Sequence, residues 1–115
     1  MGKIFKIPGE KIKRLIPPMG SCLATDRITV DGFPVGYMYR EHRGNSDGGS
    51  GWCFFSGDES EDYINQPENI SIYDVNTISN YDMDIIPYLE TKAPCSFEKI
   101  KGSNRYKRVE NPPGS

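Results

Sequence analysis

The stretch GWCFFSGDE, residues 51–59, decides how this chain folds. Successive side chains of a strand point to opposite faces, so Trp52 and Phe54 share one face. Cys53 and Phe55 share the other face, and both faces are therefore apolar. Apolar residues on both faces are typical of a strand that is covered on two sides. The pattern predicts that this stretch is the central strand of a sheet and that Trp52 and Phe54 belong to the core.

The residues before this strand predict a β-hairpin. Two β-rich runs, residues 21–30 and residues 34–41, flank the dipeptide Asp31-Gly32. Asp-Gly between two such runs is a strong turn signal, so we expect the runs to pair. The polar, glycine-rich residues 42–51 then form a loop that leads to the central strand, and we expect this loop to be mobile.

The residues after the central strand predict a short helix and another strand. Ser60 is a typical N-cap, and acidic residues follow it in the first turn, where the helix dipole favours them. The helix ends at about Gln66, because the residue before Pro67 disfavours helical backbone. The run SIYDVNTI, residues 71–78, then has the composition of a strand.

The segments after residue 79 and before residue 21 give weaker signals of secondary structure. Residues 80–90, NYDMDIIPYLE, predict a loop or short helix that carries apolar side chains into the core. Residues 95–102 and 104–110 form a closing hairpin around Gly102. Residues 1–20 alternate lysine with apolar residues and stop at a double proline, which fits an edge strand or a short helix.

Length and composition favour one small domain with an aromatic-rich core. The chain has 115 residues, of which 36% are hydrophobic and 11% aromatic. We predict a single α+β domain at residues 21–108, with a mainly antiparallel sheet and one or two short helices. Residues 1–20 form a basic N-terminal segment, and residues 109–115 form a disordered tail.

Charges are sorted along the chain. Residues 44–91 hold ten acidic residues and no lysine or arginine, whereas residues 1–43 and residues 92–115 each carry a net charge of +4. Such asymmetry indicates either an electrostatically selected partner or a fold in which the two ends neutralise the middle. The sequence leaves both interpretations open.

The motifs favour no catalytic residue, no metal and no cofactor. Cys22, Cys53 and Cys95 are odd in number and widely spaced, which predicts reduced thiols in a cytoplasmic protein and no zinc site. The four carboxylates of residues 58–62 lack the ligand spacing of a calcium loop. A thiol–imidazole pair of Cys53 with His42, the single histidine, is an alternative that the core position of Cys53 disfavours.

Two classes of partner are also disfavoured. No apolar run approaches the roughly 20 residues that a membrane-spanning helix needs. Basic residues at both ends suit phosphate contacts, but the acidic middle of the chain argues against a dedicated nucleic-acid binder. We therefore expect neither a membrane nor a nucleic acid as partner.

Acidic residues interleaved with tyrosines favour a protein-binding face. Tyrosine supplies contact area with little loss of entropy, and carboxylates steer a basic partner toward the surface. The candidate contact residues are Asp58, Glu59, Asp62, Tyr63, Asp82 and Asp84. We expect a protein partner that is basic where it meets them.

Three motifs occur in an order that resembles a bacterial family. They are VGYMYRE at residues 35–41, GWCFFSGDE at residues 51–59, and YDVNTISNYDMDIIPYL at residues 73–89. The pattern resembles small immunity proteins of polymorphic toxin systems, formerly described as a domain of unknown function. The family's usual residue at the position of Met83 is proline. The resemblance implies a cytoplasmic protein without enzymatic activity that binds and neutralises a cognate toxin, and it carries over no catalytic residue.

Two other function classes stay open beside this one. The first is a ligand-binding or regulatory accessory module that uses a pocket near Trp52. The second, which we favour least, is an enzyme. A toxin gene directly upstream would favour the immunity function. A deep polar pocket that holds carboxylates with strongly shifted pKa values would favour the accessory module or the enzyme.

Overall fold

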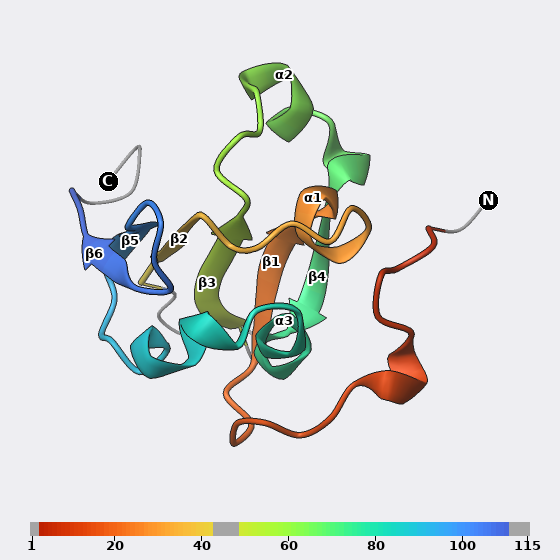
Figure 1. Ribbon diagram of the computed structural model, residues 1–115, viewed down its shortest axis with the longest axis horizontal. Coiled ribbons are helices and arrows are strands. Elements are labelled where there is room, and N and C mark those ends of the chain that lie inside the picture. The colour runs from red at the N-terminus through yellow and green to blue at the C-terminus, as the bar shows by residue number, and fades with distance from the viewer. Residues whose placement is uncertain (1–2, 43–48, 111–115) are drawn as a thin grey trace.

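The molecule is built on one mixed sheet (Figure 1). The computed structural model describes residues 3–42 and 49–110. In these residues the sheet has six strands in the order β4-β1-β3-β2-β5-β6. The strands are β1 (Ser21–Thr25), β2 (Tyr37–Arg40), β3 (Gly49–Phe55), β4 (Ile70–Asp74), β5 (Cys95–Lys99) and β6 (Tyr106–Arg108). Four of the five neighbouring pairs are antiparallel and β1 pairs with β3 in parallel, which confirms the α+β class and the mainly antiparallel sheet.

Short helices connect and cover the strands, and they are more numerous than the one or two that the sequence predicts. The α-helices are α1 (Asp26–Thr29), α2 (Glu61–Ile64) and α3 (Val75–Tyr81), and the 3₁₀ helices are η1 (Gly9–Lys11), η2 (Pro67–Asn69) and η3 (Met83–Tyr88). Helices α3 and η3 lie on the near side of the sheet in Figure 1, and α2 projects beyond one end of it.

The core lies between the sheet and these two covering helices. Trp52 and Phe54 of β3 are fully buried and stack with ring centroids 5.8 Å apart. The indole N–H of Trp52 donates to the carbonyl of Leu89 at 3.0 Å, so its one polar group is satisfied. Ile78 of α3 and Ile85 of η3 are also fully buried. The predicted central strand and its two core residues are confirmed.

The predicted hairpin around Asp31-Gly32 is wrong. The residues after β1 form α1, and the N–H of Asp31 donates to the carbonyl of Asp26 at 3.0 Å. Gly32 follows with a φ of +82°, the left-handed conformation that commonly ends a helix. The Asp-Gly pair therefore terminates α1, and β3 lies between β1 and β2 in the sheet.

The strand predicted at residues 71–78 is only half correct. Strand β4 ends at Asp74, whose carboxylate accepts the N–H of Asn76 at 2.8 Å and caps α3. Val75 and Ile78 then point to the core from one helical face, since residues three apart are neighbours on a helix. The residues that the alternating pattern assigned to the end of a strand belong to a helix.

Other local predictions are confirmed. Ser60 caps α2 by accepting the N–H of Tyr63 at 3.1 Å, although the helix ends at Ile64 and not at Gln66. Strands β5 and β6 form the closing hairpin, and Gly102 in its turn has a φ of +79°. Residues 80–90 contain η3 and bring apolar side chains into the core, as predicted.

The N-terminal segment is neither a strand nor an α-helix. It contains η1 and otherwise runs along the domain as irregular chain. The N–H of Lys6 donates to the carbonyl of Thr29, and the side-chain oxygen of Asn76 accepts the N–H groups of Leu15 and Ile16. These bonds fasten the segment to α1 and α3.

The glycine-rich loop and the tail lie largely outside the described residues. Residues 43–48 of the predicted loop and residues 111–115 of the predicted tail are not described. The end of the predicted loop is corrected, because Gly49, Ser50 and Gly51 already belong to β3. No helix in the described ranges is long and apolar enough to cross a membrane.

Candidate partner-binding site

Three aromatic rings form the floor of an open cleft on the sheet. Tyr37 and Tyr39 come from β2 and Phe55 comes from the end of β3. The rings of Tyr39 and Phe55 stack at 5.8 Å, and Tyr37 lies 6.1 Å from each of them. All three are half-buried and line a cavity of about 1350 Å³. Because Met38 and Phe54 alternate with them and are fully buried, the cleft is on the sheet face opposite the core.

The cleft has two walls of different charge. Phe33, Ile64 and the turn at residues 56–59 line one side, and the end of β5 with Lys101 lines the other. The first wall contributes Asp58 and Glu59, whereas the second contributes Lys99, Lys101 and Glu98. The two aromatic strands separate these charged groups, which in the sequence are some forty residues apart.

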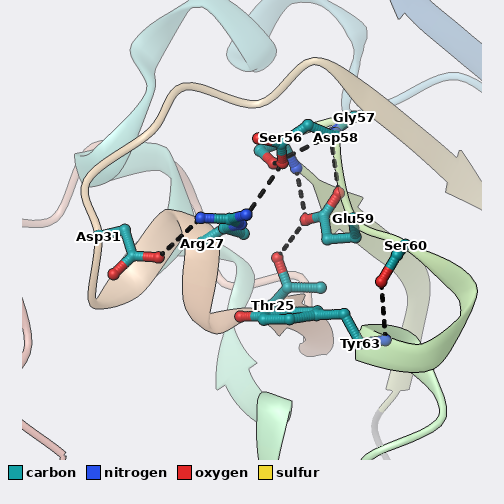
Figure 2. Close-up of polar contacts among 9 residues, drawn as sticks. All are labelled: Thr25, Arg27, Asp31, Ser56, Gly57, Asp58, Glu59, Ser60 and Tyr63. Carbon is teal, nitrogen blue, oxygen red and sulfur yellow. Dashed lines mark hydrogen bonds and ion pairs between the residues drawn. The ribbon is translucent and has the colours of Figure 1, made fainter.

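Glu59 holds the turn after β3 in place (Figure 2). Its carboxylate accepts the N–H of Ser56 at 2.8 Å, the N–H of Gly57 at 2.9 Å and the hydroxyl of Thr25 at 2.5 Å. Charge-assisted hydrogen bonds of this kind are stronger than neutral ones. Both carboxylate oxygens are therefore engaged inside the molecule, and Glu59 connects the turn to β1.

Arg27 lies at the centre of the same cluster (Figure 2). Its guanidinium is 3.5 Å from the carboxylate of Asp58 and 3.5 Å from that of Asp31. Its central carbon also lies 5.5 Å from the ring centroid of Phe33 and 5.6 Å from that of Tyr63. Ion pairs and cation–π contacts together hold α1, α2 and the turn against one another.

Asp58 keeps part of its hydrogen-bonding capacity. Its Oδ1 pairs with Arg27 and accepts the hydroxyl of Ser56, whereas Oδ2 forms no hydrogen bond or ion pair with the described residues. The side chain is 56% exposed and lines the cleft. Asp58 therefore has one carboxylate oxygen that can still accept a hydrogen bond.

Tyr63 is half-buried beside Arg27. Burial raises the pKa of its phenol, and the nearby carboxylates of Asp26 and Asp31 raise it further. The hydroxyl therefore stays protonated at neutral pH and is available as a hydrogen-bond donor.

Helix α2 and η2 carry acidic residues that the fold does not neutralise. Glu61, Asp62 and Glu68 are exposed, and none forms an ion pair with any residue that the structure describes. Since α2 projects from the body of the domain (Figure 1), these charges stand on a protruding surface.

The other two predicted contact residues lie elsewhere. Asp82 is only 8% exposed, and its carboxylate accepts the N–H of Val35 at 2.9 Å and the phenol of Tyr106 at 3.3 Å. Asp84 forms an ion pair of 3.9 Å with Lys99 at the second wall of the cleft. The structure thus brings together Asp58, Glu59, Asp62 and Tyr63 and separates Asp82 and Asp84 from them.

The basic ends of the chain neutralise part of its acidic middle. Asp58 of the acidic middle pairs with Arg27 of the N-terminal part, and Asp84 pairs with Lys99 of the C-terminal part. The ends therefore neutralise some of the middle. The acidic residues of α2 and η2 are not neutralised in this way within residues 3–42 and 49–110.

The sequence patterns did not predict the aromatic floor of the cleft. Tyr37 and Tyr39 alternate in the sequence, and this signal places them on one face of a strand. What the sequence did not provide was the neighbour, because Phe55 joins them only through the pairing of β2 with β3.

The described residues offer little for metal or thiol chemistry. No group of three or more His, Cys, Asp or Glu side chains among them is arranged to hold a metal ion. Burial raises the pKa of the Cys22 and Cys95 thiols, which keeps them protonated. His42 lines a separate cavity of about 380 Å³ with Arg40 and Lys92, and Cys53 is not among the residues that line it.

A comparison with protein families gives one match. The model of the Immunity protein Imm33 domain matches residues 22–110, which includes the whole sheet except Ser21. No curated protein and no solved structure matches the chain.

Proposed function

Because the chain belongs to the Immunity protein Imm33 domain family, we propose that it protects its cell by binding and neutralising a cognate protein toxin. The proposal places this binding in the cytoplasm and includes no catalysis, cofactor or metal. The family match is the observation that carries it, since it covers every residue of the buried core cluster except Ile16.

We place the first contact with the toxin on α2 and the adjoining turn. Glu61, Asp62 and Glu68 are exposed and form no ion pair within residues 3–42 and 49–110, and Asp58 in the adjoining turn is 56% exposed. Carboxylates on a projecting surface accelerate encounter with a basic partner. Tyr63 adds a neutral phenol and aromatic area next to these charges.

The remaining candidate residues support this surface from inside. Glu59 fixes the turn on which Asp58 stands, and Asp82 orders the chain that leads into β2. Asp84 neutralises Lys99. We assign these three carboxylates to the fold and not to direct contact.

The test is association kinetics with candidate toxin domains from genes that neighbour this one in its host, each made catalytically inactive. The variant Glu61→Lys, Asp62→Lys, Glu68→Lys should associate about tenfold more slowly than the wild type at low salt, with a smaller difference at high salt. The matched control is Glu10→Lys, Glu90→Lys, Glu110→Lys, which changes the net charge equally at exposed positions elsewhere.

Two results would contradict the proposal. If the wild-type protein does not bind the toxin domain, the immunity function is wrong. If both triple variants associate at the same rate in a folded state, binding occurs but the α2 surface does not steer it.

A further inference from the structure

We infer that the aromatic cleft receives a projecting segment of the toxin, with an apolar centre, a basic side chain toward Asp58 and an acidic side chain toward Lys101. The aromatic cleft is the space floored by Tyr37, Tyr39 and Phe55. This inference rests on the proposed function and names the second part of the contact: α2 attracts the toxin, and the cleft retains it.

The floor has the character of a binding surface. Three aromatic rings remain partly exposed on one sheet face: Tyr39 and Phe55 stack, and Tyr37 is tilted against both. Two of the rings carry a hydroxyl group, so they tolerate both water and an apolar partner. Tyrosine and phenylalanine are enriched at the centres of protein interfaces, where they dominate the binding energy. The rings come from two hydrogen-bonded strands, so they form a rigid platform.

Size favours a protein segment over a small molecule. The cavity of about 1350 Å³ exceeds the range of about 300–1,000 Å³ that is typical of small-molecule pockets. Its lining comes from β2, from the ends of β3 and β5 and from the segments beside them. A chain segment that projects from a protein partner can cover such a broad, open cavity.

The charges of the walls give the segment a direction. At one wall, Asp58 keeps an Oδ2 that forms no hydrogen bond or ion pair with the described residues, and the apolar side chain of Ile64 lines the same cavity. At the other wall, Lys101 is exposed and makes no ion pair with the described residues. Lys99 forms the long 3.9 Å pair with Asp84, and its ammonium also lies 5.9 Å from the ring centroid of Tyr106. A segment with a basic and an acidic end therefore meets opposite charges only in one orientation.

The experiment measures binding of the same inactive toxin domain to two cleft variants. Tyr37→Thr removes a floor ring and keeps a residue that suits a strand. Its control is Ile72→Thr, which removes apolar surface from a residue that is 72% exposed on the edge strand β4, outside the cleft. We expect Tyr37→Thr to weaken binding at least tenfold through faster dissociation, and Ile72→Thr to leave it unchanged.

The second variant tests the orientation of the bound toxin segment. It changes a residue in a turn, so it leaves the strands of the sheet intact. Lys101→Glu lies in the turn between β5 and β6, and its control, Lys92→Glu, makes the same charge change beside the separate cavity of His42. We expect weaker binding, by about fivefold or more, only for Lys101→Glu. Melting curves of all four variants establish that they are folded.

The outcomes separate this inference from the proposed function. If the toxin binds the wild type and both cleft variants equally, the immunity function stands and the cleft assignment is wrong. If Tyr37→Thr weakens binding and Lys101→Glu does not, the assigned direction of the segment is wrong. If the wild type does not bind at all, the proposed function fails first.

Discussion

Glu59 shows that a carboxylate in an acidic run can serve the fold. It lies among four acids in five residues, yet it accepts three hydrogen bonds from the turn and from β1. Its neighbours Glu61 and Asp62 are exposed and make no ion pair with the described chain. Adjacent residues of one type therefore have different tasks, which composition alone does not reveal.

Replacing Glu59 with glutamine should destabilise the protein by about 1–3 kcal/mol. The amide keeps the shape of the side chain but loses its charge. It also replaces one acceptor oxygen with an NH2 group, which then faces an N–H group that now donates to the carboxylate. Chemical denaturation measures the change in the free energy of unfolding. Glu61→Gln is the control and should stay within about 0.5 kcal/mol. Equal stability of the two variants would show that the bonds of Glu59 contribute nothing.

Tyr106 couples stability to alkaline pH. Its hydroxyl donates to the carbonyl of Val35 at 2.6 Å and to Asp82. Burial raises the pKa of this phenol above its ordinary value, and the carboxylate of Asp82 raises it further. A raised pKa in the folded state means that the stabilising contribution is complete below the unfolded value of about 10 and decreases as the pH rises above it.

The variant Tyr106→Phe tests this coupling. At neutral pH it should cost about 1–3 kcal/mol, because Val35 and Asp82 lose a donor. Between about pH 9 and pH 11, its stability should decrease less than that of the wild type, since the variant lacks this ionisable group. Parallel curves for the two proteins across this range would contradict the coupling.

At the scale of elements, local sequence patterns predicted the elements that are held by hydrogen bonds between residues close together in the chain. The Ser60 cap and the β5–β6 hairpin each depend on residues close together in the chain, and both are present. The predicted pairing of β1 with β2 was wrong because another strand competes for both of them, and a local sequence pattern does not show such competition. Strand β3 pairs with both β1 and β2, so it occupies the place between them.

The role of Gly32 at the end of α1 can be tested by Gly32→Ala. Its φ of +82° is unfavourable for alanine, and a Cβ would lie 3.0 Å from the side chain of Lys6. We expect a loss of about 1 kcal/mol or more in the free energy of unfolding. Gly9→Ala is the control, because a Cβ there meets no atom within 4 Å. If the two variants are equally stable, Gly32 is not required for the end of the helix.

At the scale of the whole molecule, folding neutralises only part of the acidic middle of the sequence. Ion pairs with the two ends involve Asp58 and Asp84, whereas Glu61 and Asp62 of α2 form no ion pair with the described residues. The six predicted contact residues are consequently divided. Asp58, Asp62 and Tyr63 lie on α2 or the adjoining turn, Glu59 and Asp82 are engaged in hydrogen bonds within the fold, and Asp84 pairs with Lys99. The sequence indicated the sign of the surface, and the fold determines which carboxylates belong to it.

Burial of the three cysteines gives a prediction for the whole domain. Cys22, Cys53 and Cys95 are at most 4% exposed. We expect a thiol-alkylating reagent to label the native protein slowly, at the rate of opening, and to add three groups at once after denaturation without reductant. Intact mass spectrometry distinguishes these states. A single adduct on the denatured chain would reveal a disulfide and contradict the expectation of reduced thiols.

The sequence alone was enough to predict the central strand, its two core aromatics, the serine cap of α2 and the closing hairpin. Each of these depends on alternation or capping within a few residues. The folded chain was needed to see the strand order, the hydrogen bonds that engage Glu59 and Asp82 within the fold, and the aromatic cleft. Each of these depends on contacts between distant parts of the chain, such as Phe55 with Tyr37 or Asp82 with Val35. A local pattern states what a residue prefers, but pairing and burial determine which neighbour it meets.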